Sequence, residues 1–162
     1  MLKIVNGNLF DAKEKYICHQ CNCITQKGGH LSKSMFDKFS YANVYKTRER
    51  VTDWKDSRDK PGNIDIRGNG KDQRFIINMF AQVFPGTPRF PESSTDGHSA
   101  REKYFLKCLE KIQNIENLDG VAFPYCIGCG AAGGEWKNYL KMIDDFSKKV
   151  NCDVVIYKLN EF

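Results

Sequence analysis

Two glycine-rich segments of this chain have the composition of loops that hold an anion. Residues 18–32 run from an apolar stretch into the pair Gly28-Gly29, and residues 123–136 hold four glycines and two alanines within seven positions. Glycine lets the backbone approach a ligand without a Cβ clash, and the free N–H groups of a helix that follows favour a phosphate. Each segment alone could be a tight turn, but the two together predict an anion-binding site.

Neither segment matches a common nucleotide-binding fingerprint, because no Gly-Lys-Ser or Gly-Lys-Thr follows and the dinucleotide glycine spacing is absent. The titratable candidates are His19, His30, Asp96 and His98. His30 directly follows the glycine pair, so its imidazole would donate a proton or stabilise charge beside a phosphate or sugar. A surface-loop histidine is the alternative for His30. His19 lies in a strand pattern, where a hydrogen-bonded core histidine is the alternative.

Apolar periodicity and turn residues predict strands that alternate with helices. Strands are expected at residues 2–5, 16–23, 64–66, 74–82, 120–124 and 153–159, and helices at residues 31–39, 99–115 and 136–150. This order predicts an α/β protein, a single domain over residues 1–162 folded as a three-layer α/β/α sandwich with a mixed, mostly parallel central sheet. Both glycine segments then follow strands, at the edge where open sheets of this class bind ligands.

Three further segments carry specific expectations. Residues 43–56 are polar and expected to be partly helical, and residues 83–98 contain three prolines and are expected to form a long irregular loop. Ser99 and Glu102 have the spacing of a capping box that starts the second helix.

The composition is that of an ordinary globular domain, with 41% apolar and 28% charged residues among 162. Apolar runs such as Phe75–Phe84 are too short to cross a bilayer, and no signal-peptide pattern follows Met1. The net charge is +5, but the Lys and Arg residues are scattered among 20 acidic ones. A dedicated nucleic-acid face is therefore a weak interpretation. We therefore expect an intracellular protein with no membrane partner.

Seven cysteines, an odd number, favour a reduced protein over a disulfide framework. The pairs Cys18/Cys21 and Cys126/Cys129 have Cys-x-x-Cys spacing, which could suggest zinc. An odd separation along a strand, however, points Cys18 and Cys21 to opposite faces. We expect small buried apolar residues and no metal site.

Three motifs together resemble the macro domain family. They are Gly7-Asn8-Leu9-Phe10, then His19-Gln20-Cys21-Asn22-Cys23 with Gly28-Gly29, and finally Ile127-Gly128-Cys129-Gly130 with Trp136. Their order and spacing are similar to those of macro domains over nearly the whole chain. The resemblance is closest to the subgroup that includes the yeast-type ADP-ribose 1''-phosphate phosphatase and the terminal ADP-ribose protein glycohydrolase.

The resemblance implies a site for ADP-ribose and no resident cofactor. Asn8 stands where the family has an Asp that receives the adenine amino group, and Asn22 would face the distal ribose. Phe10 or Tyr157 would touch the adenine unless they belong to the core. The implied ligand-binding residues are Asn8, Leu9, Phe10, Asn22, Gly28, Gly29, His30, Leu31, Ser32, Ile127, Gly128, Cys129, Gly130, Ala131, Ala132, Gly133 and Tyr157. The candidate catalytic residues are Asn22, His30 and His19.

The chain also departs from the glutamate-ester hydrolases of that subgroup. Their central-strand Lys and the Asp after Gly-Cys-Gly are missing, since residues 78–82 hold no Lys and the loop has Ala131-Ala132. Ser93, Ser94, Thr95, Asp96 and His98 in the 83–98 loop are candidates for a substitute acid or base.

Three functions remain open. We expect a hydrolase that removes a phosphate, an amino-acid side chain or a base from the distal ribose of ADP-ribose. The alternative is a non-catalytic reader of ADP-ribosylated macromolecules, and a nucleic-acid-binding module is the interpretation from outside the family. The expected partners are ADP-ribose or an ADP-ribosylated macromolecule, with nucleic acid only if it is itself ADP-ribosylated, and the expected state is a monomer.

Overall fold

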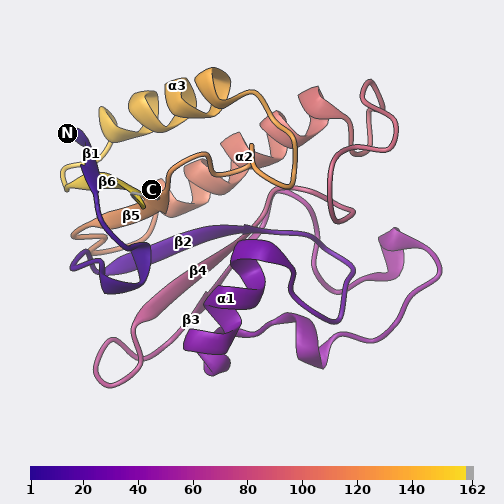
Figure 1. Ribbon diagram of the computed structural model, residues 1–162, viewed down its shortest axis with the longest axis horizontal. Coiled ribbons are helices and arrows are strands. Elements are labelled where there is room, and N and C mark those ends of the chain that lie inside the picture. The colour runs from indigo at the N-terminus through magenta and orange to yellow at the C-terminus, as the bar shows by residue number, and fades with distance from the viewer. Residues whose placement is uncertain (160–162) are drawn as a thin grey trace.

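A computed structural model describes residues 1–159 and places six strands in one sheet with three α-helices. Figure 1 shows how they alternate along the chain. The strands are β1 (Leu2–Asn6), β2 (Tyr16–Cys21), β3 (Ile64–Arg67), β4 (Phe75–Phe80), β5 (Val121–Pro124) and β6 (Val154–Lys158). The helices are α1 (His30–Lys38), α2 (His98–Gln113) and α3 (Trp136–Ser147).

The sheet has the strand order β1-β6-β5-β2-β4-β3. Every neighbouring pair is parallel except β3 and β4, which are antiparallel and joined by the loop at residues 68–74. The predicted mixed, mostly parallel α/β architecture is therefore confirmed.

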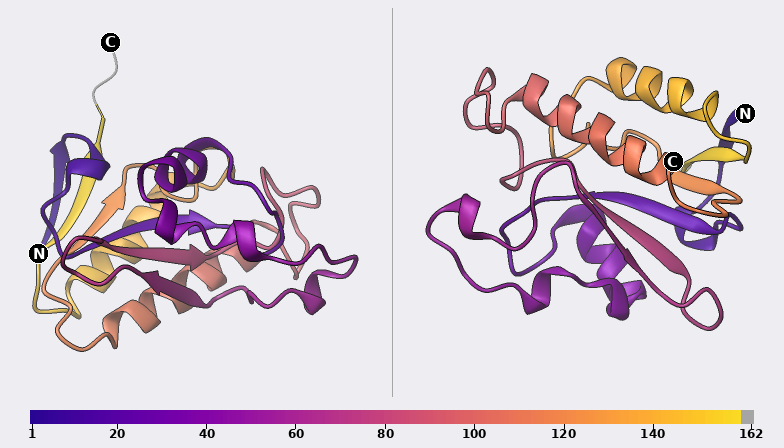
Figure 2. Two further views of the ribbon diagram at one scale, coloured as in Figure 1. Left: turned by 90° about the horizontal axis from the view of Figure 1, so that it is seen from below. Right: turned by 180° about the vertical axis from the view of Figure 1, so that it is seen from behind.

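Helices cover both faces of the sheet. Figure 2 shows the sheet edge-on, with α1 on one face and α2 and α3 on the other. The two-residue period of β4 explains the layering, because Ile77 faces Phe105 and Leu109 of α2, whereas Ile76 belongs to the other core with Met35 of α1. Burial of these apolar side chains on both faces holds the three layers together.

The cysteine pair in β2 obeys the same alternation. Cys18 lies in the core beneath α2 and α3, and Cys21 lies in the core beneath α1, as the odd spacing predicts. Burial raises the pKa of both thiols well above its ordinary value. Both side chains therefore act as small apolar residues in the two cores.

The start of α2 differs from the prediction. The helix begins at His98 with Gly97 as its N-cap, so Ser99 lies in the first turn and does not cap it. The loop backbone supplies the cap contacts, because Gly97 N donates to Ser93 O (2.9 Å) and His98 N to Pro91 O (2.8 Å). Glu102 accepts a hydrogen bond from Asn138 of α3 (3.0 Å) instead.

Residues 43–56 also contain less helix than expected. They form only short 3₁₀ turns, at Tyr45–Thr47 and Trp54–Asp56. Within residues 1–159, no helix combines the length and apolarity needed to cross a bilayer.

Candidate functional site

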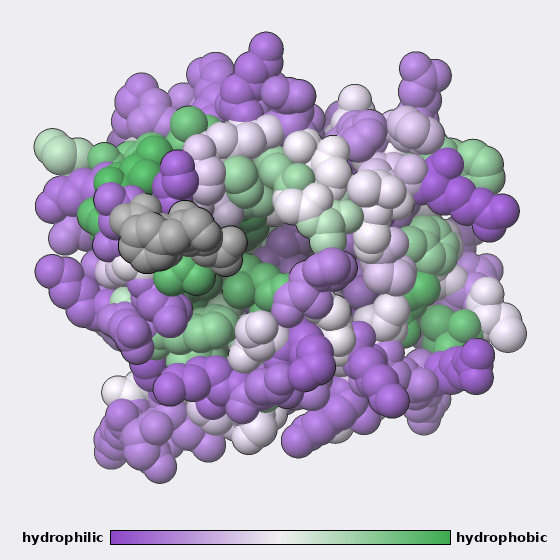
Figure 3. Space-filling view, viewed as in Figure 1, coloured by the Kyte–Doolittle hydropathy of each residue, from purple (hydrophilic) through white to green (hydrophobic). Residues whose placement is uncertain are grey.

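The two glycine loops lie side by side at one edge of the sheet. Strands β2 and β5 are parallel neighbours, with Tyr16 paired to Val121, so their carboxyl ends reach the same edge. The first loop runs from β2 to α1 and the second from β5 to α3 (Figure 1). The surface in Figure 3 is hollowed near its centre, with polar residues gathered around the periphery.

A cavity of about 300 Å³ lies between the two loops, and we call it the glycine-loop cavity. Its lining residues are Gln20, Asn22, Gly29, His30, Leu31, Ser32, Tyr45, Gln82, Pro85, Gly86, Pro124, Tyr125, Cys126, Ile127, Gly128, Gly130, Ala131 and Ala132. These residues include members of both predicted glycine segments. The structure thus brings together segments that are about a hundred residues apart in the chain.

A second cavity of about 420 Å³ adjoins the first, and we call it the aromatic cavity. Its lining residues are Gly7, Asn8, Leu9, Phe10, Leu31, Ser34, Pro124, Tyr125, Tyr157, Lys158 and Leu159. Leu31, Pro124 and Tyr125 line both cavities, so the two form one elongated site. Neither lining contains a carboxylate side chain.

The second glycine loop leaves several backbone donors free. Within residues 1–159, the N–H groups of Gly128, Gly130, Ala131 and Ala132 make no hydrogen bond, although the loop is closed by Gly134 N to Gly128 O (3.0 Å). Successive unpaired N–H groups in a turn form a concavity that binds anions. The loop therefore offers a phosphate group several donors without any charged side chain.

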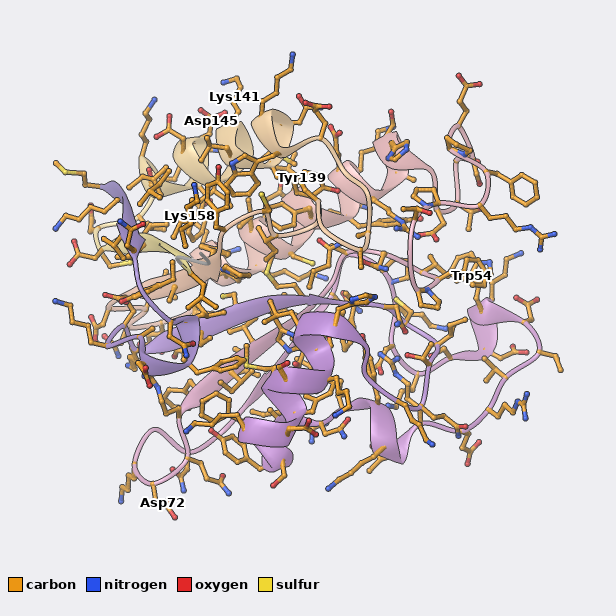
Figure 4. The ribbon with its side chains drawn as sticks, in the orientation of Figure 1. Trp54, Asp72, Tyr139, Lys141, Asp145 and Lys158 are labelled. Carbon is orange, nitrogen blue, oxygen red and sulfur yellow. The ribbon has the colours of Figure 1, made fainter. Side chains whose placement is uncertain are left out.

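Gly128 is required by the packing behind this loop. Its φ is +77°, and a Cβ there would lie 2.6 Å from Tyr139 Cε1 and 3.0 Å from Gln20 Oε1. Tyr139 extends from α3 (Figure 4), and its buried ring packs against Phe105 of α2 at 4.8 Å between centroids. Only glycine combines this backbone conformation with this close approach.

The N-terminus of α1 lies at the site, where His30, Leu31 and Ser32 line the glycine-loop cavity. The helix begins after Gly29 and has no side-chain cap. Its first N–H groups are therefore free, and the helix dipole places partial positive charge there.

Two non-glycine residues at the site have a left-handed backbone. His30 has a φ of +51° and Cys126 a φ of +61°, and both line the glycine-loop cavity. This conformation costs about 1–2 kcal/mol for a residue with a Cβ, and such strain gathers at functional sites. Burial raises the pKa of Cys126, which makes its thiol a poor nucleophile.

Asn22 lines the cavity, but most of its side chain is committed to the first loop. Its Oδ1 accepts hydrogen bonds from Ile24 N (3.0 Å), Thr25 N (2.9 Å) and Arg48 Nη1 (3.2 Å), while its Nδ2 donates to Thr25 Oγ1 (2.9 Å). One amide N–H remains for a ligand. Asn22 can therefore donate one hydrogen bond while it shapes the loop.

Arg48 holds this arrangement in place, and sequence reasoning missed it. Its buried guanidinium pairs with Asp59 (2.7 Å), lies 4.2 Å from the Tyr45 ring centroid and donates to Asn22 O (2.6 Å). The polar sequence around Arg48 contains no signal for this role, because its hydrogen-bond partners Asn22 and Asp59 come from two other segments.

His19 lies outside both cavities. It is fully buried, and its Nε2 donates to Asn78 Oδ1 (2.5 Å), whose amide nitrogen in turn donates to Ala42 O (3.1 Å). Burial lowers the pKa of His19 to about 4, so the ring is neutral at pH 7. The structure thus places His19 as a hydrogen-bonded core histidine, the alternative weighed from the sequence.

The 83–98 loop supplies walls of the glycine-loop cavity but contributes no acid or base to the lining of either cavity. Asp96 is buried and pairs with Arg101 (2.7 Å), and its carboxylate also accepts from Val83 N (2.7 Å) and Phe84 N (3.1 Å). Ser93, Ser94, Thr95 and His98 line neither cavity. The expectation of a substitute catalytic group from this loop is therefore wrong, because its one buried carboxylate is fully used by the fold.

Three of the expected ligand residues shape the loops without lining either cavity, namely Gly28, Cys129 and Gly133. A Cβ on Gly28 would lie 2.9 Å from Lys33 N, so this glycine allows the tight entry into α1. Gln20 and Gln82 do line the glycine-loop cavity and were missed. Gln20 Oε1 is the one buried side-chain oxygen or nitrogen in the described chain without a hydrogen-bond partner.

Asn8, Leu9, Phe10 and Tyr157, four of the expected ligand residues, line the aromatic cavity. Asn8 Oδ1 accepts from Phe10 N (2.9 Å), which leaves its amide N–H₂ free. Tyr157 donates to Glu14 Oε1 (2.5 Å), and burial together with this carboxylate raises the pKa of Tyr157 to about 12. The phenol is therefore neutral, and its ring is available as a flat wall.

No protein-family model matches the chain, and no curated protein matches it in sequence. Solved structures do match it. The macrodomain of Mycobacterium tuberculosis DarG is 20% identical, with a TM-score of 0.69 and 97% of each chain covered. A macrodomain protein from Streptomyces coelicolor is 17% identical, with a TM-score of 0.70 and coverage of 99% of this chain and 100% of that chain. Thermosipho africanus DarTG, solved in complex with ADP-ribose, is 17% identical, with a TM-score of 0.70 and coverage of 97% of this chain and 41% of that chain. The chain therefore has the macrodomain fold.

Proposed function

We propose that the protein binds ADP-ribose along the elongated site. The adenine occupies the aromatic cavity, where Phe10, Tyr125 and Tyr157 offer flat rings. The diphosphate and the distal ribose occupy the glycine-loop cavity. The observation that carries this proposal is the adjacency of an aromatic cavity to a cavity rich in free backbone N–H groups.

The charges at the site fit a diphosphate. The uncapped N-terminus of α1 and four residues of the second loop with free N–H groups line the glycine-loop cavity, and no carboxylate side chain lines either cavity. Backbone donors of this kind bind phosphate without a lysine or arginine. The complex of Thermosipho africanus DarTG with ADP-ribose supports the same ligand on this fold.

Isothermal titration calorimetry with free ADP-ribose tests this function. We expect a micromolar dissociation constant, roughly 8 kcal/mol. The affinity should change little with salt, whereas a protein that binds a polyanion weakens steeply as salt rises. Absence of binding by the folded protein would overturn the proposal, and a steep salt dependence would favour the nucleic-acid interpretation.

We further propose that the protein hydrolyses a bond at C1'' of the distal ribose. His30 is the only Asp, Glu, His, Lys or Arg residue among those that line the glycine-loop cavity. Burial raises the pKa of Tyr45 and of Cys126, two weakly acidic side chains of the same lining, away from neutrality. An imidazole can assist a leaving group or activate water near neutral pH, which is typically worth ~10²–10⁴-fold in rate.

The free N–H of Asn22 would orient a ribose hydroxyl or water beside His30. A non-catalytic reader is the alternative, and the observation in its favour is that His19 and Asp96 are both committed to the fold. His30 supports the hydrolase over the reader, because a reader has no need for an imidazole held in a strained backbone conformation at this position.

Product release should be measured from ADP-ribose 1''-phosphate, ADP-ribosyl-glutamate protein and ADP-ribosylated nucleic acid. His30→Ala should lower turnover at least tenfold while ADP-ribose still binds, and His30→Gln is the matched variant that keeps a polar side chain. If the wild-type protein binds ADP-ribose and releases nothing from all three substrates, the protein is a reader.

A further inference from the structure

Arg101 is a buried side chain near the site that no part of the proposed binding mode uses. It comes from the first turn of α2 and is only 2% exposed. Its guanidinium donates to both carboxylate oxygens of Asp96 (3.1 and 2.7 Å). Burial of a guanidinium without a paired carboxylate carries a large desolvation free energy, and Asp96 is that partner.

The remaining N–H groups of Arg101 bind three backbone carbonyls from two loops. Nη1 donates to Gly86 O (2.6 Å) and Ala132 O (3.3 Å), and Nη2 donates to Phe84 O (3.1 Å). Gly86 and Ala132 both line the glycine-loop cavity, one from the 83–98 loop and one from the second glycine loop. One side chain therefore links two walls of the cavity from behind.

A second contact joins the same two walls. A Cβ on Gly133 would lie 2.6 Å from Thr87 Cγ2, so the loop backbone packs directly on the Thr87 methyl group. Gly133 has a φ of +75°, which favours glycine independently of that contact. The 83–98 loop and the second glycine loop thus share a close interface next to the cavity.

The network also includes Gln20 and Gln82, two polar side chains that line the glycine-loop cavity and that we call its polar floor. Phe84 O accepts from Gln82 Nε2 (2.8 Å) as well as from Arg101, and Gln82 Oε1 accepts from Gln20 Nε2 (2.8 Å). Because a carbonyl only accepts, Phe84 O fixes the orientation of the Gln82 amide, and Gln82 then fixes that of Gln20. Displacement of Phe84 would disturb both glutamines.

We propose that Arg101 is a positioning residue that sets the width and the polar floor of the glycine-loop cavity, and that it thereby selects for the distal ribose. This inference rests on the proposed binding of ADP-ribose. Arg101 does not touch the ligand. Its role needs the planar five-donor fork of a guanidinium, which the three-donor ammonium of lysine cannot reproduce.

Arg101→Lys keeps the charge opposite Asp96 and loses the links to the two loops. Calorimetry should compare ADP-ribose with AMP, whose adenosine needs only the aromatic cavity. We expect the affinity for ADP-ribose to fall at least tenfold and the affinity for AMP to change less than twofold. A merely structural role would weaken both ligands alike or neither.

Amide hydrogen exchange gives a second readout that needs no ligand. Exchange in residues 84–88 and 130–134 should rise in Arg101→Lys more than in the strands. If Arg101→Lys does not fold, Thr87→Ala tests the junction of the same two walls, because Thr87 is exposed and this change removes the methyl group that packs on Gly133 without freeing the loop backbone. Thr87→Ala should cause a several-fold loss confined to ADP-ribose.

Equal losses for both ligands, or unchanged ADP-ribose affinity in whichever variant folds, would overturn the role of Arg101 while leaving the proposed function intact. Wild-type protein that binds neither ligand would instead overturn the proposed function.

Discussion

Gly130→Glu places a carboxylate where the diphosphate is expected, and it should weaken ADP-ribose binding strongly. An added Cβ at Gly130 meets no atom within 4 Å, so a side chain can be accommodated without distortion of the loop. Gly130 lines the glycine-loop cavity and carries one of the four free N–H groups of the second loop. The variant therefore tests where the ligand binds, because the fold should be unchanged.

The size of the effect follows from the charges. A unit charge ~4 Å from a phosphate charge costs about 4 kcal/mol at an effective dielectric constant of ~20. The cavity is open to solvent on one side, so we discount this to about 2 kcal/mol, which corresponds to a loss of affinity of about 30-fold. Steric exclusion of the diphosphate by the side chain adds to that loss.

Titration calorimetry with ADP-ribose measures the loss, and thermal unfolding verifies the fold. Gly130→Gln has the same size without the charge, so the difference between the two variants isolates electrostatics and should shrink as salt rises. Gly130→Ala should bind within about threefold of wild type. A folded Gly130→Glu protein that binds ADP-ribose as tightly as wild type would refute the placement of the diphosphate.

Three further predictions concern strain, pH and cysteine chemistry. His30→Gly relieves the left-handed strain but adds flexibility to the unfolded chain, so urea unfolding should show equal stability or a gain of up to about 1 kcal/mol, and a clear loss would contradict the strain argument. Because burial lowers the pKa of His19 from 6.5 to about 4, the unfolded chain binds a proton in that window that the folded chain does not. The free energy of unfolding should therefore fall by up to about 3 kcal/mol as the pH drops from 6.5 to 4, and His19→Asn should flatten that slope in pH-dependent urea titrations. All seven cysteines should react as free thiols in the denatured, reduced protein, and elemental analysis should find no stoichiometric zinc, since one zinc per chain would contradict the strand geometry of Cys18 and Cys21.

Much of the fold was predictable because its signals are local. The two-residue alternation of β2 places Cys18 and Cys21 in different cores, and the apolar spacing of residues 31–39 predicts α1. The start of α2 was mispredicted, because Ser99 and Glu102 match a cap pattern that the loop backbone at Pro91 and Ser93 makes unnecessary. A local pattern cannot reveal donors and acceptors supplied by a distant segment.

The candidate site likewise has a part that the sequence predicted and a part that it did not. Its glycine loops were visible in the sequence, because a nearly bare backbone before a helix has few uses other than a tight turn or an anion site. The residues that hold those loops were not visible. Arg48 and Arg101 each bind carbonyls from segments that are remote in sequence, and nothing around either arginine distinguishes it from the solvated charges elsewhere in the chain.

The sequence by itself determined the alternation of strands and helices, the two glycine loops and the residue types available for chemistry, because these depend on local backbone preferences and side-chain identity. Only the tertiary structure decided which of those residues are free to act. His19 is buried and bonded to Asn78, and Asp96 is buried and paired with Arg101. His30, by contrast, lines the cavity. The difference arises because burial and hydrogen-bond partners depend on contacts between segments that the chain order does not specify.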